Sequence, residues 1–183
     1  NGGGYMSAAL DIAGHFIGNS PAIIVEDKSQ SKIKYRAIDH GKVIEKPVIF
    51  LINEYSASAS EILAAAVKDY NKAVFVGTTT YGKGVAQQMF PLSDGSFLKI
   101  TMEEFYSPHG NVIHKTGVSP DFEVKSKEVD SLKIANLLLS STRLPEDKRG
   151  YVRIDLDGKE FYINSAMARS EEYWTEFKYI LSK

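Results

Sequence analysis

The apolar run from Pro47 to Ile52 constrains the fold of this chain most strongly. A continuous apolar stretch between Lys46 and Asn53 is typical of a strand that is covered on both faces, as in a parallel sheet, so we expect a central strand here. Residues 58–70 then carry apolar side chains at helical spacing, and residues 73–77 form a second apolar strand. Strand, helix and strand in this order predict a right-handed crossover and an α/β fold.

The remaining elements alternate between helical and strand patterns around turn-forming residues. Helical spacing is found over residues 6–17, from residue 129 to 138, and near the end of the chain. Two antiparallel hairpins are predicted before residue 110, and a third follows residue 150. The predicted hairpins comprise residues 23–25 with 33–38, 85–92 with 96–102, and 151–156 with 159–163.

A length of 183 residues favours one domain with a small addition. We predict a main domain over residues 1–142, a charged linker over 143–150, and a small β-β-α appendage over 151–183 that packs on the core or on a partner. The glycine-rich start without a methionine predicts that the chain begins inside a domain.

Composition excludes several classes of function. With 22 basic and 23 acidic residues, the net charge of −1 provides no field that would attract nucleic acid or an anionic membrane. The absence of cysteine excludes thiol nucleophiles, thiolate metal sites and disulfides, and it leaves the cellular compartment undetermined.

Small residues surround Ser58, between the apolar strand and the predicted helix. Two interpretations stand side by side. Ser58 with Glu61 three residues later matches a capping box, in which the serine only caps the helix. A serine at a helix N-terminus is also a favourable place for an oxyanion, because free backbone N–H groups and the helix dipole face it.

A serine nucleophile needs a general base, and none of the four histidines lies in a recognisable triad motif. Lys83 is the alternative, within the glycine-flanked turn Thr80-Tyr81-Gly82-Lys83-Gly84. A lysine acts as a base only when its amine is neutral, and a lysine in such a turn is more often simply exposed to solvent. The turn lacks the spacing of a phosphate-binding loop.

Five motifs occur in the order and spacing of one known family. They are Asn-Gly-Gly-Gly at residues 1–4, Asn53 with Ser-Ala-Ser-Ala-Ser-Glu at 56–61, Gly-Lys-Gly at 82–84 with Gln87, Tyr-Ser-Pro-x-Gly at 106–110, and Gly-x-x-Pro-Asp at 117–121. Over about residues 1–125 the chain resembles the carboxyl-terminal processing proteases, the tail-specific serine peptidases of family S41. The resemblance does not extend to the predicted appendage.

The resemblance implies roles for individual residues. The nucleophile of the family falls on Ser58 and its general-base lysine on Lys83, which lies 25 residues later. Gln87 would orient the lysine. The backbone N–H groups of Ala59 and Gly3 would form the oxyanion hole. No cofactor and no metal are implied.

One further position is open to two interpretations. Asp69 matches an aspartate that is implicated in some members of the family. It is equally a candidate for an exposed carboxylate at the end of a helix, with no part in the reaction.

The resemblance also implies a fold and a setting. We expect part of a spiral-sheet α/β core like that of Clp protease and crotonase, with the β-β-α appendage added. Family members carry a further strand and a PDZ domain upstream, and the PDZ domain captures the C-terminal residues of protein substrates. The implied enzyme is a serine endopeptidase that cleaves proteins near their C-termini. It would act in the bacterial cell envelope, in the periplasm, and would have no nucleic-acid partner. A homo-oligomer is compatible with this.

Two other functions fit the same elements. A crotonase-like acyl-CoA enzyme shares the sheet and the backbone oxyanion hole but needs no serine–lysine pair. A scaffold without catalytic activity would use Ser58 only as a helix cap and residues 151–183 for assembly.

Overall fold

The computed structural model describes residues 2–140, 149–156 and 158–183. The chain forms two compact units, and each is discontinuous in sequence. The first unit contains residues 1–45, 53–72 and 79–119; the second contains residues 46–52, 73–78 and 120–183. Among the described residues, no helix has the length and apolar character needed to cross a membrane.

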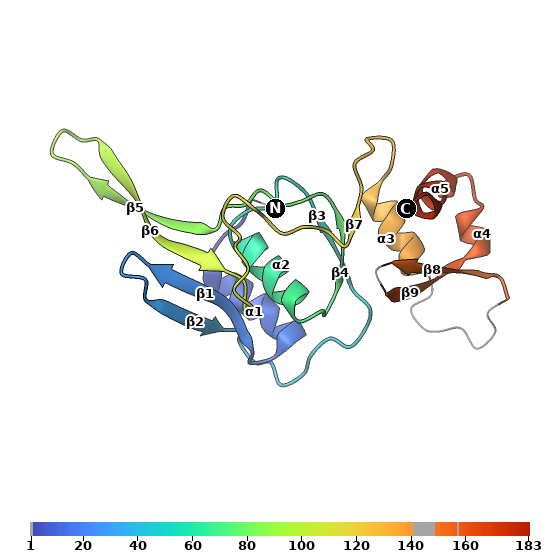
Figure 1. Ribbon diagram of the computed structural model, residues 1–183, viewed down its shortest axis with the longest axis horizontal. Coiled ribbons are helices and arrows are strands. Elements are labelled where there is room, and N and C mark those ends of the chain that lie inside the picture. The colour runs from blue at the N-terminus through green and yellow to red at the C-terminus, as the bar shows by residue number, and fades with distance from the viewer. Residues whose placement is uncertain (1, 141–148, 157) are drawn as a thin grey trace. The chain divides into compact units, whose positions relative to one another are not determined.

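The first unit combines two helices with one four-stranded antiparallel sheet (Figure 1). The strand order is β2-β1-β6-β5, so β5 lies at one edge and forms a long hairpin with β6. The helices pack against each other, and α2 also contacts β1. All of these elements were predicted. Their bounds are α1 Met6–Ile17, β1 Pro21–Asp27, β2 Lys32–Arg36, α2 Ala59–Asp69, β5 Val85–Pro91 and β6 Phe97–Tyr106.

Small residues allow the two helices of this unit to approach closely. Ala9 and Ala13 of α1 are buried, as are Ala65 and Ala66 of α2. Gly14 of α1 packs against the backbone of residue 38, which lies outside both helices. A Cβ at Gly14 would lie 1.6 Å from the carbonyl oxygen of that residue. Packing without voids at such short separation excludes larger side chains at these positions.

The second unit contains a short parallel sheet with the order β3-β4-β7. Residues 47–52 were predicted to contain the central strand, but among the described residues β3 lies at the edge of this sheet and β4 in the middle. Leu51 is accordingly 43% exposed. An apolar run shows that a strand is partly buried but not how many neighbours it has. The elements are β3 Ile49–Ile52, β4 Val74–Gly77, β7 Phe122–Glu123, α3 Ser131–Leu138, β8 Tyr151–Leu156, β9 Lys159–Asn164, α4 Ser165–Ala168 and α5 Trp174–Leu181.

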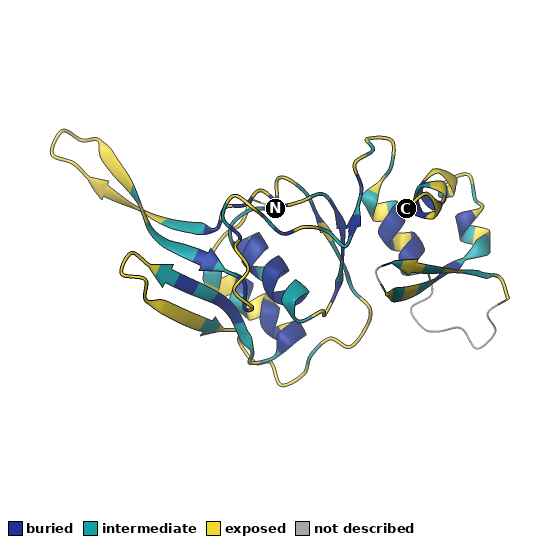
Figure 2. Cartoon of the chain, viewed as in Figure 1, coloured by how far each residue is buried: buried dark blue, intermediate teal, exposed yellow. Residues whose placement is uncertain are grey.

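The C-terminal segment shares one apolar core with the parallel sheet of this unit. Its helices α3, α4 and α5 each carry buried residues (Figure 2). Side chains from β4, β7, α3, β9, α4 and α5 meet in the core. The predicted boundary at residue 142 and residues 143–148 of the predicted linker lie outside the described residues. The hairpin and final helix predicted after residue 150 are confirmed. The buried side chains of the core are Val76, Phe122, Val124, Ile134, Leu137, Leu138, Ile163, Ala168, Phe177 and Ile180.

This shared core predicts a large effect of truncating Ile163, which is 0% exposed. Ile163→Ala should lower the free energy of unfolding by about 2–5 kcal/mol, because it removes buried methyl groups and leaves a cavity. Urea unfolding of the natural full-length protein measures the change. Leu132→Ala is the matched control, because Leu132 of α3 is 54% exposed and should lose less than about 0.5 kcal/mol. Equal losses for the two variants would contradict the shared core.

Candidate active site

Two loops leave the parallel strands β3 and β4 at the same end of their sheet. The strands pair in register, with Ile52 opposite Gly77. Ser58 follows Ile52 by six residues and Lys83 follows Gly77 by six residues. The spacing of 25 residues between Ser58 and Lys83 therefore equals the offset of the paired strands. Ser58 and Lys83 thus lie at corresponding positions after the two strands, because the crossover from Ile52 to Gly77 spans 25 residues.

Ser58 has a backbone conformation that residues other than glycine rarely adopt. Its φ is 57° and its ψ is −120°, immediately before the first residue of α2. Positive φ values at residues other than glycine cost about 1–3 kcal/mol and gather at functional sites. The turn thus presents a serine at the helix N-terminus, where N–H groups are free of helical partners. Such an arrangement suits a nucleophile in acyl transfer.

A single buried carboxylate connects the serine loop, which bears Ser58 between β3 and α2, to the lysine loop, which bears Lys83 between β4 and β5. Glu61 is 0% exposed. Its Oε2 accepts hydrogen bonds from the backbone N–H of Ser58 at 2.9 Å and of Lys83 at 2.8 Å. Its Oε1 accepts from the Thr80 hydroxyl at 2.5 Å and from the Gly82 N–H at 2.6 Å. Four donors on one side chain fix both loops to the first turn of α2.

The sequence indicated only part of this arrangement. Ser58 and Glu61 at capping-box spacing predicted the bond between the Glu61 carboxylate and the Ser58 N–H. The bonds to Thr80, Gly82 and Lys83 bridge 19 to 22 residues, and no local pattern predicts them.

Thr80 extends the connection to the Gly-x-x-Pro-Asp motif. Besides donating to Glu61, its hydroxyl accepts a hydrogen bond from the Val118 N–H at 2.7 Å. Gly117 approaches the same residue so closely that a Cβ there would lie 2.4 Å from the Thr80 carbonyl oxygen. Its φ of +72° is also one that favours glycine. The motif glycine is thus required by the packing of the lysine loop.

Ser58 and Lys83 line one cavity of about 400 Å³. Ala59, Gln87 and Lys99 also line it, and the rest of its wall is Gly4 and apolar side chains. Within the described part of the chain, no hydrogen bond joins the Ser58 hydroxyl to the Lys83 amine, and the Lys83 side chain is exposed. Such contacts commonly tighten only when substrate is bound. The described residues contain no group of three or more His, Asp or Glu arranged to hold a metal ion.

Gly3 lies directly against Ser58. A Cβ at this position would lie 2.7 Å from the carbonyl oxygen of Ala57, 2.8 Å from the Ser58 Cβ and 3.2 Å from the Ala59 nitrogen. Its φ of +91° is a second reason for glycine. The structure therefore brings the backbone of Gly3 beside that of Ala59, the two predicted oxyanion donors.

Gln87 lines the same cavity, but its amide points to another residue. The Gln87 Nε2 donates to the Thr101 hydroxyl oxygen at 3.3 Å across the β5–β6 hairpin. The pairing of these strands shifts register between Ala86 and Gln87, and such a bulge re-aims the side chains beside it. The sequence prediction could not include this bulge. A role of Gln87 in orienting Lys83 stays a prediction.

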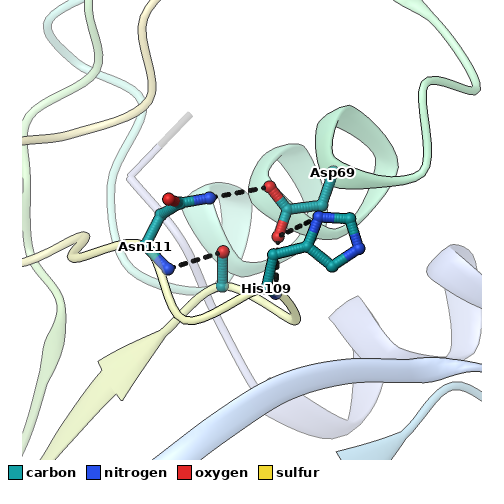
Figure 3. A network of polar contacts seen from close by, with 4 residues as sticks. Asp69, His109 and Asn111 are labelled. Atoms are coloured by element: carbon teal, nitrogen blue, oxygen red, sulfur yellow. Dashed lines mark hydrogen bonds and ion pairs between the residues drawn. The ribbon is translucent and has the colours of Figure 1, made fainter.

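Asp69 belongs to a different polar network, at the far end of α2 (Figure 3). Its carboxylate accepts from the backbone N–H of His109 at 2.8 Å and from the Asn111 amide at 3.2 Å. The side chain is only 10% exposed, so it is not a freely solvated carboxylate. It lines a separate cavity of about 230 Å³ that does not include Ser58 or Lys83. Asp69 thus holds the Tyr-Ser-Pro-x-Gly turn.

The Glu61 contacts predict a stability loss on the smallest substitution. Glu61→Gln replaces one acceptor oxygen with an NH₂ group, so two of the four donors lose their partner. Unsatisfied buried donors cost about 1–3 kcal/mol each, and the free energy of unfolding should fall by at least about 2 kcal/mol. Urea unfolding of the natural full-length protein measures it. Glu45→Gln changes the same groups at an exposed position and should be neutral. Similar values for both variants would refute a stabilising role of the four hydrogen bonds to Glu61.

Comparison with known proteins places the sequence in a family. The sequence profile of peptidase family S41 matches residues 1–124. The chain is 38% identical over 130 residues to the carboxy-terminal processing protease CtpB of Bacillus subtilis, covering 70% of this chain and 27% of CtpB. It is 36% identical over 138 residues to a probable CtpA-like serine protease of Staphylococcus epidermidis, covering 73% of this chain and 28% of the relative.

A solved structure agrees with these relatives. The photosystem II D1 C-terminal processing protease shares 34% sequence identity with this chain at a TM-score of 0.61, over 68% of this chain and 32% of that one. The fold is therefore a mixed α/β fold like that of S41 proteases. This chain spans less than a third of the length of the relatives named here. The resemblance seen in the five motifs is confirmed, and the chain belongs to peptidase family S41, among the carboxy-terminal processing proteases.

Proposed function

We propose that this chain carries the catalytic centre of a serine endopeptidase with a Ser58–Lys83 dyad. The observation that supports it most is that Ser58, Ala59 and Lys83 line one cavity, with Gly3 packed against the serine. A nucleophile, a base and two backbone donors are the parts that acyl transfer requires. Family membership supports proteolysis as the reaction.

In this proposal the neutral Lys83 amine takes the Ser58 proton while the serine oxygen attacks the carbonyl carbon of the scissile peptide. The tetrahedral intermediate collapses to an acyl-enzyme, and Lys83 passes the proton to the leaving amine. A water molecule then gives up a proton to Lys83 and attacks the ester. Release of the second product restores the serine hydroxyl and the neutral lysine.

Backbone N–H groups would stabilise the oxyanion. Ala59 is the first residue of α2, so its N–H has no helical partner. The N–H of Gly3 would supply the second hydrogen bond, and the positive end of the helix dipole adds to both. The bond from the Ser58 N–H to Glu61 leaves that group engaged elsewhere.

The substrates proposed are proteins cleaved near their C-termini, as the names of the relatives indicate for those proteins. β5 is an edge strand that contributes to the cavity wall, and an extended peptide can pair with such an edge. We further propose a PDZ domain as the partner that delivers these substrates, action in the bacterial periplasm, and a spiral continuation of the sheet as in Clp protease and crotonase. A homo-oligomer is compatible with this proposal.

Substituting the dyad tests the proposal. In the natural full-length protein, Ser58→Ala and Lys83→Arg should each abolish cleavage of a peptide substrate, since arginine stays charged and cannot accept the proton. Ser58→Ala should cost only about 1 kcal/mol of stability as a lost cap. Proteolysis that survives either substitution would refute the dyad; stability loss with intact proteolysis would support the helix-cap interpretation.

Gly3 offers an independent test of the oxyanion hole. Gly3→Ala places a methyl group against Ser58 and Ala59, so kcat should fall by about 10²–10³, the effect of losing one oxyanion donor. Gly41→Ala is the matched control, because Gly41 also has a positive φ, of +69°, but no atom lies within 4 Å of the added Cβ. Steady-state kinetics on both variants separates crowding from backbone strain. Equal kcat values would argue against Gly3 as a donor.

A further inference from the structure

The cavity around Ser58 carries positive charge without a matching negative charge. Lys83 and Lys99 both line it, and no carboxylate is among its lining residues. Within the part of the chain that the structure describes, neither amine takes part in an ion pair or a hydrogen bond. The dyad uses only Lys83. The second lysine therefore has no function in the mechanism proposed above.

Lys99 is held on a strand rather than on a mobile loop. It lies on β6 opposite Met89 of β5, two residues from Thr101, which binds the Gln87 amide. Side chains two residues apart on a strand point to the same face, about 7 Å apart along the chain. Lys99 thus follows the Gln87–Thr101 pair along one face of the hairpin, in the direction of its tip.

The acidic residues of this sheet gather in a different hollow. It has a volume of about 440 Å³ and includes Glu26, Asp27, Glu103 and Glu104 in its lining. Tyr106 lies there as well, and a hydrogen bond with the Glu26 carboxylate raises the pKa of Tyr106 to about 12. Lys32 pairs with Glu26 at 3.5 Å. Glu26 is thus engaged with its own neighbours, and none of these four carboxylates lines the cavity of Lys99.

We propose that Lys99 is a specificity-determining residue that binds a carboxylate of the peptide substrate beside the scissile bond. The inference rests on the proposed peptidase function. The carboxylate is either an acidic side chain or the free α-carboxylate of a substrate cleaved very near its end. An ammonium group is a compact charge with three donors, so it accepts both sources.

Matched peptides measure the preference and its source. One pair differs by Glu against Gln, moved through the three positions on each side of the cleaved bond. A second pair differs by a free C-terminus against a C-terminal amide. In the natural full-length protein, the carboxylate member of at least one pair should be cleaved with about tenfold higher kcat/KM, as expected for a hydrogen bond to a charged group.

Variants assign the preference to Lys99. Lys99→Met keeps the length of the side chain without charge and should remove the preference, while Lys99→Glu should reverse it. Lys34→Met is the control, since Lys34 is an exposed lysine of β2 that does not line the cavity. A preference on the Glu–Gln pair identifies an acidic side chain, and one on the amide pair identifies the α-carboxylate. No preference in the wild type, or one that persists in Lys99→Met, overturns the proposal.

A binding measurement separates this proposal from the catalytic one. Fluorescence anisotropy of the same labelled peptides with Ser58→Ala, and with Ser58→Ala combined with Lys99→Met, needs no turnover. Tighter binding of the carboxylate peptides, lost in the double variant, supports Lys99 even if the wild type cleaves none of them. Cleavage without any such preference leaves the dyad standing and refutes the role of Lys99.

Discussion

The buried carboxylate of Glu61 is the interaction on which the candidate site depends. A charge removed from water is tolerated only when hydrogen bonds satisfy it, and here four donors do so. Because those donors come from the serine loop and the lysine loop, the need to satisfy one carboxylate determines the backbone positions of both. The strained conformation of Ser58 persists because its N–H is one of the four.

The sequence predicted the chemical groups of the site better than their contacts. The 25-residue spacing of Ser58 and Lys83 is now explained by the register of β3 and β4, which follows from the length of one crossover. Gly3 lies beside Ala59, and the role of both as oxyanion donors, which the resemblance implies, stays a prediction. Gln87 pairs with Thr101 because of a strand bulge, and Asp69 serves a distant turn; neither contact has a local sequence signal.

Elements with a strong sequence periodicity were predicted from the sequence. Features that depend on which strands pair with each other were not. Helices α1 and α2 and the hairpins have long, regular patterns and were found. The position of β3 at a sheet edge, and the two-residue strand β7, depend on pairing with residues far away in the sequence. The membership in family S41 agrees with the peptidase interpretation.

The discontinuity of the two units has a consequence for how such a protein can be altered. The segments that bear Ser58 and Lys83 each begin where a strand of the second unit ends, so the polypeptide passes repeatedly from one unit to the other. A gene fragment that ends at residue 119 would keep every candidate catalytic residue but lose most of the core that supports β4. Because each unit is made of three separate segments, recombination that exchanges one whole unit between relatives needs crossovers at several points in the sequence.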